Sequence, residues 1–437
     1  MFDSWSKNGS RRASQGPKTN RPPRKTLAVA GALALALSLG YLQGMTTPRA
    51  TPAIASVPEA GTPGFISQLA AFTSSSATTV QVTGMWELPD EYFAARIEAV
   101  RQAKRSIRFE TFFMTPGKRA DDFAQALIER AKAGVTVQMI VDAAGQSLDD
   151  AYWRSLKEAG VDVRFYHPFD ARSPLRYNAR SHRKILVVDG EVAFTGGVGV
   201  SDHWDGTKQD LEPWSDLEIR YEGPAVQATS AVFQQHWAAL GGNVTLDEPV
   251  KRRDGSPALL SAASPADDES AIRWLYLATI RSAKERLWIA SPYFLPGTAE
   301  RQALVEAKHR GVDVRVLTEG PRNDKRYAYL AMREKYGPLI TAGVTIYEYQ
   351  PSFMHAKAIL VDDEWAAFGS ANLDPRSFFH NDELQLGVAD PTVAARLAGF
   401  FDRAILKSKH ITQEVWDARP LEERALGTAA RMVRFQL

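Results

Sequence analysis

The chain has 437 residues, enough for two domains of about 150–200 residues each. It has no cysteine, which excludes disulfide bonds, thiolate metal ligands, a cysteine nucleophile and a lipid-modified N-terminal cysteine. The formal net charge is +2, but residues 1–25 hold seven Lys or Arg against one Asp, so the rest of the chain is mildly acidic. An acidic body is unsuited to binding a phosphate backbone, and no nucleic acid partner is expected.

An apolar run follows the basic start of the chain. Residues 27–42 (LAVAGALALALSLGYL) carry no charge and, as a helix, span about 24 Å, at the short end for a bilayer crossing. We therefore predict a basic cytoplasmic arm at 1–26 and a transmembrane anchor or signal segment at 27–45. An uncleaved anchor is favoured over a signal peptide, because the small-x-small sequence AIA at 53–55 comes late. A buried soluble helix is the third alternative.

The charges also predict an orientation. Positive residues on the N-terminal side of an apolar segment favour a cytoplasmic N-terminus, with the body on the outer or periplasmic side of the membrane. The body is secreted or periplasmic if the segment is cleaved. Residues 46–84 are rich in Pro, Thr, Ala and Ser and are interpreted as a linker.

Helical and strand patterns alternate after the linker. This alternation predicts an α/β fold in which helical crossovers join parallel strands and cover both faces of a sheet. The predicted elements are helices at 90–103, 120–133 and 148–159 and strands at 106–113, 135–141 and 161–166.

The same unit occurs twice in the chain. The stretch AVRQAKRSIRFETFF from Ala99 matches TIRSAKERLWIASPYF from Thr279, and AFTGGVGVSD matches AFGSANLDP. The offsets of 173 to 183 residues indicate duplication of a whole domain rather than a short repeat. We predict domains at 85–245 and 246–410 and a helical tail at 411–437, which either lies on a membrane or packs against the body.

Each copy carries one His-x-Lys-x-x-x-x-Asp motif. SHRKILVVDG starts at Ser181 and MHAKAILVDD at Met354, and both are interpreted as buried strands. Residues i and i+2 of a strand share a face, so each histidine projects beside its lysine. The aspartates have the opposite parity and follow the strand. We count them in the catalytic motif but interpret them as architectural. The motif residues are His182, Lys184 and Asp189 in the first copy and His355, Lys357 and Asp362 in the second.

An imidazole beside an ammonium group suits a phosphodiester substrate. The lysine binds phosphate oxygens, and the histidine attacks phosphorus or donates a proton to the leaving alkoxide. One histidine cannot do both at once. Two copies allow one to attack while the other acts first as acid and then as base. No metal or other cofactor is required, because two lysines can neutralise the phosphate oxygens.

These motifs resemble those of the phospholipase D superfamily and, within it, the bacterial cardiolipin synthases. The resemblance covers about residues 85–420 and is densest in IYEYQP, HAK and GSANLDPRS of the second half and NARSHRKILVVDG of the first. It implies two α/β-sandwich domains related by a pseudo-twofold axis and a phosphatidyltransferase of a bacterial cell membrane. It also implies phospholipid substrates similar to phosphatidylglycerol and an active site complete in one chain, with no obligate oligomer.

The resemblance assigns further residues. Ser370 and Asn372 match phosphate-binding positions, Glu383 matches an acid that orients a histidine, and Asp216 is the matching acid of the first half. Gly197 stands at the position of the serine. The sequence departs from the family pattern at Gly199, where asparagine is usual, and at Ser215, where arginine is usual. The family's behaviour assigns nucleophilic attack to His182 and acid–base catalysis to His355. The remaining histidines have no motif partner and are interpreted as structural or surface residues: His167, His203, His236, His309, His380 and His410.

Three other functions remain possible from the sequence. A hydrolytic phospholipase D needs the same residues with water as the acceptor. A nuclease shares the motif, although the acidic body argues against it. A non-enzymatic membrane scaffold is the alternative from a different class, but it has no use for two intact histidine–lysine pairs.

Overall fold

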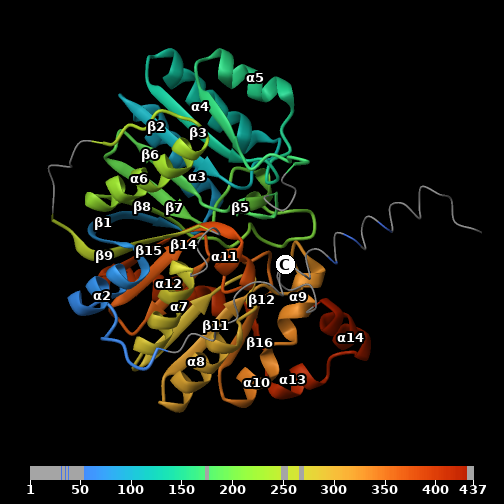
Figure 1. Ribbon diagram of the computed structural model, residues 1–437. Coiled ribbons are helices and arrows are strands. Elements are labelled where there is room, and N and C mark those ends of the chain that lie inside the picture. The colour runs from blue at the N-terminus through green and yellow to red at the C-terminus, as the bar shows by residue number, and fades with distance from the viewer. Residues whose placement is uncertain are drawn as a thin grey trace, which may run out of the picture. The chain divides into compact units, whose positions relative to one another are not determined.

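The structure is a computed structural model that describes residues 54–172, 177–247, 254–264 and 270–430, together with the isolated positions 31, 35 and 38. The described residues from 54 onward belong to one compact unit, in which two halves of similar architecture follow one another along the chain (Figure 1).

The first half contains eight strands among the described residues. They are β1 (Ser76–Trp86), β2 (Ser106–Thr111), β3 (Thr136–Asp142), β4 (Asp162–Tyr166), β5 (Arg180–Ser181), β6 (Ile185–Val188), β7 (Val192–Gly196) and β8 (Glu218–Glu222). Its helices are α2 (Pro63–Thr73), α3 (Pro89–Gln102), α4 (Lys118–Lys132), α5 (Asp150–Glu158) and α6 (Pro224–Ala239), with a 3₁₀ turn η2 at Asp202–Asp205.

The second half has a matching set of elements. Its strands are β9 (Ser256–Ala263), β10 (Arg286–Ala290), β11 (Asp313–Thr318), β12 (Thr345–Tyr349), β13 (Ala358–Val361), β14 (Trp365–Gly369), β15 (Asn381–Ala389) and β16 (Ser408–His410). Its helices are α7 (Ala271–Ser282), α8 (Thr298–His309), α9 (Arg326–Arg333), α10 (Tyr336–Thr341), α11 (Pro375–Phe379), α12 (Pro391–Leu406), α13 (Gln413–Asp417) and α14 (Leu421–Ala430).

The six elements predicted for the first half are confirmed, with ends displaced by at most two residues. Local chemistry explains their boundaries. Helix α3 starts with Pro89 and has Asp90 and Glu91 in its first turn, where a fixed φ and negative charge both favour a helix N-terminus. Helix α5 is capped at its N-terminus by the side chain of Asp149, which accepts a hydrogen bond from the N–H of Tyr152.

The duplication is visible in the order of the strands. The described strands form one sheet, and its halves meet where β1 pairs with β9 in antiparallel fashion. From this junction outward, the first half runs β1-β8-β7-β6-β2-β3-β4 and the second β9-β15-β14-β13-β10-β11-β12, with β16 at the edge. Strands at equivalent places thus come from equivalent sequence segments.

The sheet is mixed. Strands β2-β3-β4 and β10-β11-β12, which helices join, run parallel as predicted, and the short β5 also pairs with β15 in parallel fashion. The remaining pairs of neighbouring strands are antiparallel, which the alternation of helices and strands did not predict. Strands β6 and β7 are separated by three residues, a connection that can join only antiparallel neighbours.

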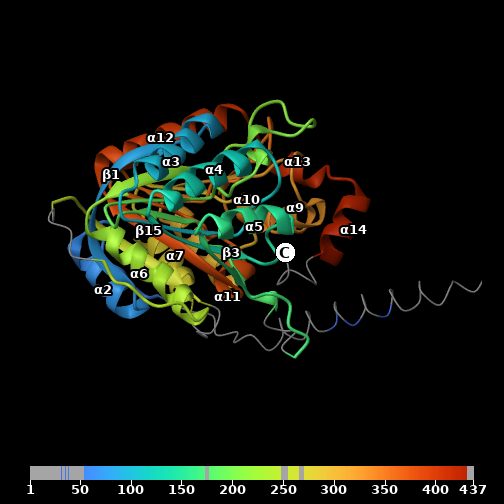
Figure 2. The same cartoon turned by 90° about the horizontal axis from the view of Figure 1, so that it is seen from above.

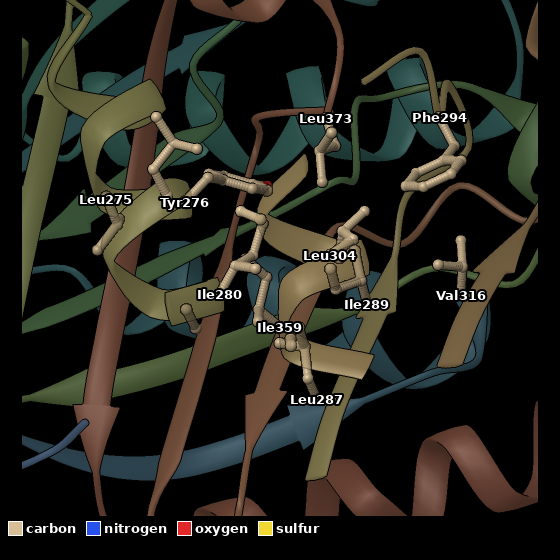
Figure 3. Packing of buried hydrophobic residues seen from close by; sticks show 14 of the residues in the cluster. Leu275, Tyr276, Ile280, Leu287, Ile289, Phe294, Leu304, Val316, Ile359 and Leu373 are labelled. Atoms are coloured by element: carbon tan, nitrogen blue, oxygen red, sulfur yellow. The ribbon is translucent and has the colours of Figure 1, made fainter. Parts of the chain in front are cut away.

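Helices cover both faces of the sheet. In the first half, α3, α4 and α5 lie side by side in both views (Figures 1 and 2) and bury one apolar cluster against β2 and β3, while α6 packs on the opposite face. In the second half, α7 and α8 pack on β10, β11 and β13 through side chains that interdigitate (Figure 3). They include Leu275, Ile280, Leu287, Ile289, Leu304, Val316 and Ile359. Each fully buried Leu or Ile contributes roughly 1.5–3 kcal/mol.

The segment predicted as a linker is partly regular structure. Helix α2 and most of β1 lie within 46–84, because SATTVQVTGMW is rich in β-branched residues that suit a strand. In the tail, α14 packs on α9. There Arg333 pairs with Glu423 at 3.1 Å, and Gly427 lies against the Leu330 carbonyl.

The predicted anchor at 27–45 lies outside the described residues apart from three isolated positions. Among the helices that are described, none combines the length and the apolar content that a bilayer crossing requires.

Candidate functional site

The two motif histidines lie in extended segments that lead into β6 and β13. The prediction that they lie within the strands is wrong, since each strand begins directly after the motif lysine. Both segments are held by the backbone of the other half. The His182 N–H donates to the Asp382 carbonyl at 2.9 Å, beside the pairing of β5 with β15. The His355 N–H donates to the Ser215 carbonyl at 2.6 Å.

Each histidine is bonded to the acid of the opposite half. The Nδ1 of His182 lies 3.0 Å from both carboxylate oxygens of Glu383, and the Nδ1 of His355 lies 2.8 Å from Oδ2 of Asp216. The sequence analysis lists each acid with the histidine of its own half, so the pairing is crossed. A carboxylate only accepts hydrogen bonds, so Nδ1 carries the proton and Nε2 keeps its lone pair.

Both imidazoles are neutral near pH 7. Burial, together with the charges of Lys184 and Lys357, lowers the pKa of His182 to about 4, although Glu383 opposes this shift. Burial and the charge of Lys357 likewise lower the pKa of His355 to about 4, against the attraction of Asp216.

The two acids stay ionised. Burial alone raises the pKa of Glu383, but His182 and Lys184 more than offset it, and the pKa falls to about 2. The pKa of Asp216 is lowered for the corresponding reason: His355 and Lys357 outweigh the effect of burial.

The motif lysines lie within the same electrostatic environment. Lys184 and Lys357 are buried, and each donates to the carbonyl of its own motif histidine, at 2.7 and 2.5 Å. Burial and the charge of Lys357 lower the pKa of Lys184 to about 7, and burial lowers the pKa of Lys357 to about 8. Each lysine also lowers the pKa of the histidine of the other half, so the four basic groups influence one another electrostatically.

Aromatic rings wall this site. The ring of Phe112 meets His182 edge-on at 5.4 Å between centroids, and Trp204 meets His355 in the same way at 5.6 Å. Trp204 also donates its indole N–H to Asp216 at 2.8 Å. Trp204 was not predicted from the sequence, although its place in SDHW, directly after the glycine-rich stretch, is a signal that could have found it.

The glycine at 197 and the departure at Gly199 have a steric explanation. A Cβ at Gly197 would lie 2.2 Å from the Asp216 carboxylate, and one at Gly199 would lie 2.5 Å from the Phe113 carbonyl and 2.9 Å from the Trp204 ring. A side chain at either position would therefore collide with groups that already occupy the space. Ser215 contributes to the site through its backbone. Its N–H donates to the Phe353 carbonyl, and its carbonyl accepts the N–H of His355.

Ser370 and Asn372 occupy different environments. The hydroxyl of Ser370 donates to Glu383, so it supports the acid that orients His182. Ser377, which the sequence analysis did not select, also donates to Glu383, at 2.8 Å. Asn372 is 4% exposed, and its Oδ1 has no hydrogen-bond partner within the described part of the chain. A phosphate-binding role remains a prediction for both Ser370 and Asn372.

His236, interpreted from the sequence as a structural or surface residue, is linked to the first motif through Glu110. Its Nδ1 lies 2.6 Å from Glu110, whose carboxylate also accepts the hydroxyl of Ser181 next to His182. Burial and the charge of Arg183 oppose protonation, but the carboxylates of Glu110 and of Asp382, whose Oδ2 lies 3.6 Å from Nε2, raise the pKa of His236.

The motif aspartates lie at the far end of β6 and β13 from the lysines. Asp189 accepts the backbone N–H groups of Lys104, Arg105 and Ser106 at 2.7–2.9 Å, and Asp362 makes equivalent bonds to 284–286. Both have positive φ, 55° and 50°, which Asp tolerates. Each carboxylate therefore links the turn after its own strand, β6 or β13, to the start of the neighbouring strand, β2 or β10.

This geometry gives a test of the architectural interpretation. Asp189→Ala is expected to lower the free energy of unfolding by about 2 kcal/mol, because three N–H groups lose their acceptor and alanine disfavours positive φ. The turnover per folded molecule is expected to stay within twofold of the unaltered chain. Urea unfolding and an activity assay measure the two quantities. A loss of activity above 100-fold at unchanged stability would make Asp189 a chemical residue.

In the residues that the structure describes, no cluster of three or more His, Asp or Glu side chains could hold a metal ion. The residues brought together are two histidine–carboxylate pairs and two lysines, groups able to attack a phosphodiester and to transfer a proton.

Comparisons with known proteins identify the family of the chain. The family described as "Cardiolipin synthase, PLD-like domain" matches residues 97–237 and 276–405, one match in each half. "Cardiolipin synthase 2" of Bacillus anthracis is 32% identical over 354 residues, covering 79% of this chain and 68% of that protein. "Cardiolipin synthase A" of Pseudomonas fluorescens is 35% identical over 332 residues, covering 74% and 68%.

A solved structure shares the fold. The crystal structure of phosphatidylserine synthase from Haemophilus influenzae Rd KW20 superimposes with a TM-score of 0.63 and covers 85% of this chain and all of that chain. Its sequence identity is 14%, so the likeness concerns the fold alone.

Proposed function

Because the chain belongs to the cardiolipin synthase family of phospholipase D-like proteins, we propose that it is a phosphatidyltransferase that forms cardiolipin from two phosphatidylglycerol-like lipids. The observation that carries the proposal is the pair of neutral histidines, each bonded through Nδ1 to a carboxylate of the other half and each beside a buried lysine.

The first step cleaves the donor lipid. Nε2 of His182 attacks phosphorus, the P–O bond to the glycerol headgroup breaks, and a phosphatidyl-histidine forms. The departing oxygen takes a proton from His355. Burial and Lys357 disfavour the protonated form of His355 in the empty site, but the negative charge of a bound phosphodiester favours it. Lys184 and Lys357 neutralise the phosphate oxygens.

The second step regenerates the enzyme. His355, now neutral, removes the proton from a hydroxyl of the second lipid, whose oxygen attacks the phosphatidyl-histidine. The P–N bond breaks, and His182 regains its lone pair while the product leaves. Ser370 and Ser377 hold Glu383 in place, and Glu383 keeps the proton of His182 on Nδ1 throughout.

Product analysis tests the proposal directly. The full chain, incubated with vesicles that contain isotope-labelled phosphatidylglycerol, is expected to release glycerol and form doubly labelled cardiolipin, as measured by mass spectrometry. Phosphatidic acid as the sole product would instead identify a hydrolytic phospholipase D, since water can replace the acceptor without any change in the residues. Turnover of plasmid DNA but not of lipid would identify a nuclease.

The pKa values predict a pH profile. For a phosphodiester with a p-nitrophenol leaving group, which needs no general acid, kcat/KM is expected to be level between about pH 5 and 6. Below this range His182, whose pKa burial lowers to about 4, becomes protonated and loses its nucleophilic lone pair. Above it Lys184 and then Lys357, whose pKa values burial lowers to about 7 and 8, lose the charge that binds phosphate.

A variant separates the two lysines. Lys184→Arg keeps a charge at all these pH values, so the remaining decline is expected to move to about pH 8, where Lys357 titrates. Initial rates between pH 4 and 10 measure the profile. An alkaline limb that stays at the same pH in this variant would contradict the assignment.

We propose that the basic arm and residues 27–45 keep the enzyme at a bacterial membrane, with the N-terminus cytoplasmic and the body on the outer side. The apolar run and its basic flank support this topology. Since one chain supplies both motifs, a monomer is proposed to be active. Removal of residues 1–45 is expected to release the protein from the membrane fraction.

A further inference from the structure

His236, on helix α6, lies between two carboxylates that come from different halves of the chain. Its Nδ1 is 2.6 Å from Oε1 of Glu110 in β2, and its Nε2 is 3.6 Å from Oδ2 of Asp382 in β15. All three side chains are buried, with at most 5% exposed. Within the described structure, neither Nε2 nor Oδ2 has a hydrogen-bond partner elsewhere, so each is the polar group that the other faces. We call these three residues the buried bridge.

The charges at the buried bridge balance when the imidazole is protonated. Burial raises the pKa values of Glu110 and Asp382, but the charges of His236 and Arg183 more than offset it, and both acids stay ionised. Burial and Arg183 oppose the protonation of His236, but the two carboxylates raise its pKa. Tyr166, whose ring stacks on the imidazole at 4.4 Å between centroids, stays neutral, because burial and Asp382 raise the pKa of its hydroxyl. Two negative and two positive charges therefore offset one another.

The two acids hold the residues that directly precede the nucleophile and its orienting acid. Oε1 of Glu110 also accepts the hydroxyl of Ser181 at 2.5 Å, and Ser181 pairs in register with Asp382 where β5 meets β15. The next residues along the two segments are His182 and Glu383, which form the 3.0 Å hydrogen bond of the site. Successive side chains of an extended chain point to opposite faces. The buried bridge therefore holds this pair from the face opposite to the imidazole of His182.

The second motif has no such bridge at the equivalent positions. Glu110 pairs across the sheet with the residue that follows the motif lysine, and Ala290 takes this place in the second half. Asp382 directly precedes the acid that is bonded to one motif histidine, and Ser215 takes this place for the other. Alanine and serine carry no charge. Of the two motif histidines, only His182 is therefore fixed in this way.

Attack on phosphorus depends on the exact place of the attacking atom, and an error of about 1 Å can cost about 100-fold in rate. We propose that His236 is a positioning residue that, through the buried bridge, holds His182 and Glu383 in the alignment that attack on phosphorus requires. This role rests on the proposed phosphatidyltransferase function, in which His182 is the nucleophile.

Single-turnover kinetics test the role. With enzyme in excess over a p-nitrophenyl phosphodiester, the release of p-nitrophenol reports attack by His182 alone. His236→Gln keeps a polar side chain but removes the charge, and it is expected to lower the maximal rate constant by about 10- to 100-fold, the effect of a misplaced nucleophile. The enzyme concentration that gives half the maximal rate is expected to stay within about twofold, because the motif lysines that bind phosphate are unaltered.

A double-variant cycle tests the bridge itself. Asp382→Asn removes the charge at the other end and is expected to slow attack by a similar factor. The double variant His236→Gln/Asp382→Asn is expected to be no slower than the slower single variant, because both changes break the same link. Gln234→Ala is the matched control. Gln234 is buried on the same helix and donates to Gln138 at 3.5 Å, and its loss is expected to leave the rate constant within about twofold.

A milder variant covers the case in which His236→Gln does not fold, as judged by circular dichroism. Ser181→Ala removes one hydrogen bond to Glu110 and is expected to slow attack by about 5- to 10-fold, with the half-saturating concentration unchanged. An unaltered rate constant in His236→Gln, or in Ser181→Ala if His236→Gln does not fold, would overturn the role. A parallel rise of the half-saturating concentration, an equal effect of Gln234→Ala, or multiplied effects in the double variant would overturn it as well.

Failure of the proposed function is recognised separately. If the unaltered chain releases p-nitrophenol but forms no cardiolipin, the transferase proposal fails, while the kinetic test of His236 still applies. If it reacts with neither substrate, ¹⁵N NMR of labelled histidine decides instead. His182 is expected to carry its proton on Nδ1 in the unaltered chain, and His236→Gln is expected to move part of the population to the Nε2–H tautomer. An unchanged tautomer would then overturn the role.

Discussion

Alanine in place of His182 is expected to abolish both transfer to lipid and transfer to water, lowering kcat by about 10⁴-fold or more. Without its Nε2 no phosphatidyl-histidine forms, and no other described side chain is bonded to Glu383 in a way that replaces it. The loss is expected even for a p-nitrophenyl phosphodiester, since a good leaving group does not replace a nucleophile.

His355→Ala is expected to behave differently with that activated substrate. p-Nitrophenolate leaves without a proton, so attack by His182 still occurs and releases a burst of p-nitrophenol that approaches one equivalent of enzyme. Turnover then stalls, because no base activates the acceptor. Stopped-flow absorbance measures the burst, and mass spectrometry of acid-sensitive peptides locates the phosphorylated histidine.

The two variants together assign the roles. A burst in the His182→Ala enzyme and none in His355→Ala would reverse the assignment. Equal loss of the burst in both would remove the division of labour between the halves. Asp189→Ala is the control, because Asp189 belongs to the same motif, but within the described structure its carboxylate accepts backbone N–H groups away from the lysines.

Sequence patterns were sufficient for the local elements and for the duplication. Helix α4 and strand β3 follow directly from the periodicity of apolar residues, and the paired motifs mark equivalent strands in each half. The mixed sheet was not predicted, because apolar runs such as those of β6 and β13 look the same in parallel and antiparallel neighbours. Only the length of the connections distinguishes them.

The crossed pairing of acids and histidines could not be predicted from the sequence, for a different reason. It depends on two backbone bridges, β5 to β15 and Ser215 to Met354, which join segments about 140 to 200 residues apart. No local pattern records such pairings. Gly199 likewise counted as a departure from the family pattern, whereas a Cβ at this position would lie 2.5 Å from the Phe113 carbonyl and 2.9 Å from the Trp204 ring.

Glu383→Gln is expected to give the same kinetic result as His182→Ala, not that of His355→Ala. An amide at 383 can donate toward Nδ1, which then favours the tautomer with its proton on Nε2 and removes the lone pair that attacks phosphorus. A wrong tautomer of this kind costs about 10⁴-fold in kcat. The p-nitrophenol burst is expected to disappear, with the melting temperature within a few degrees of the unaltered protein.

Asp216→Asn is expected to give the opposite pattern. It disturbs the His355 tautomer, so kcat for lipid transfer falls by about the same factor, but His182 and its bond to Glu383 stay intact and the burst persists. If each acid served the histidine of its own half, Glu383→Gln would keep the burst and Asp216→Asn would lose it. The absorbance traces of these two variants therefore decide whether each acid orients the histidine of the other half in the working enzyme. They also decide whether one half alone can hold its histidine in the tautomer that catalysis requires.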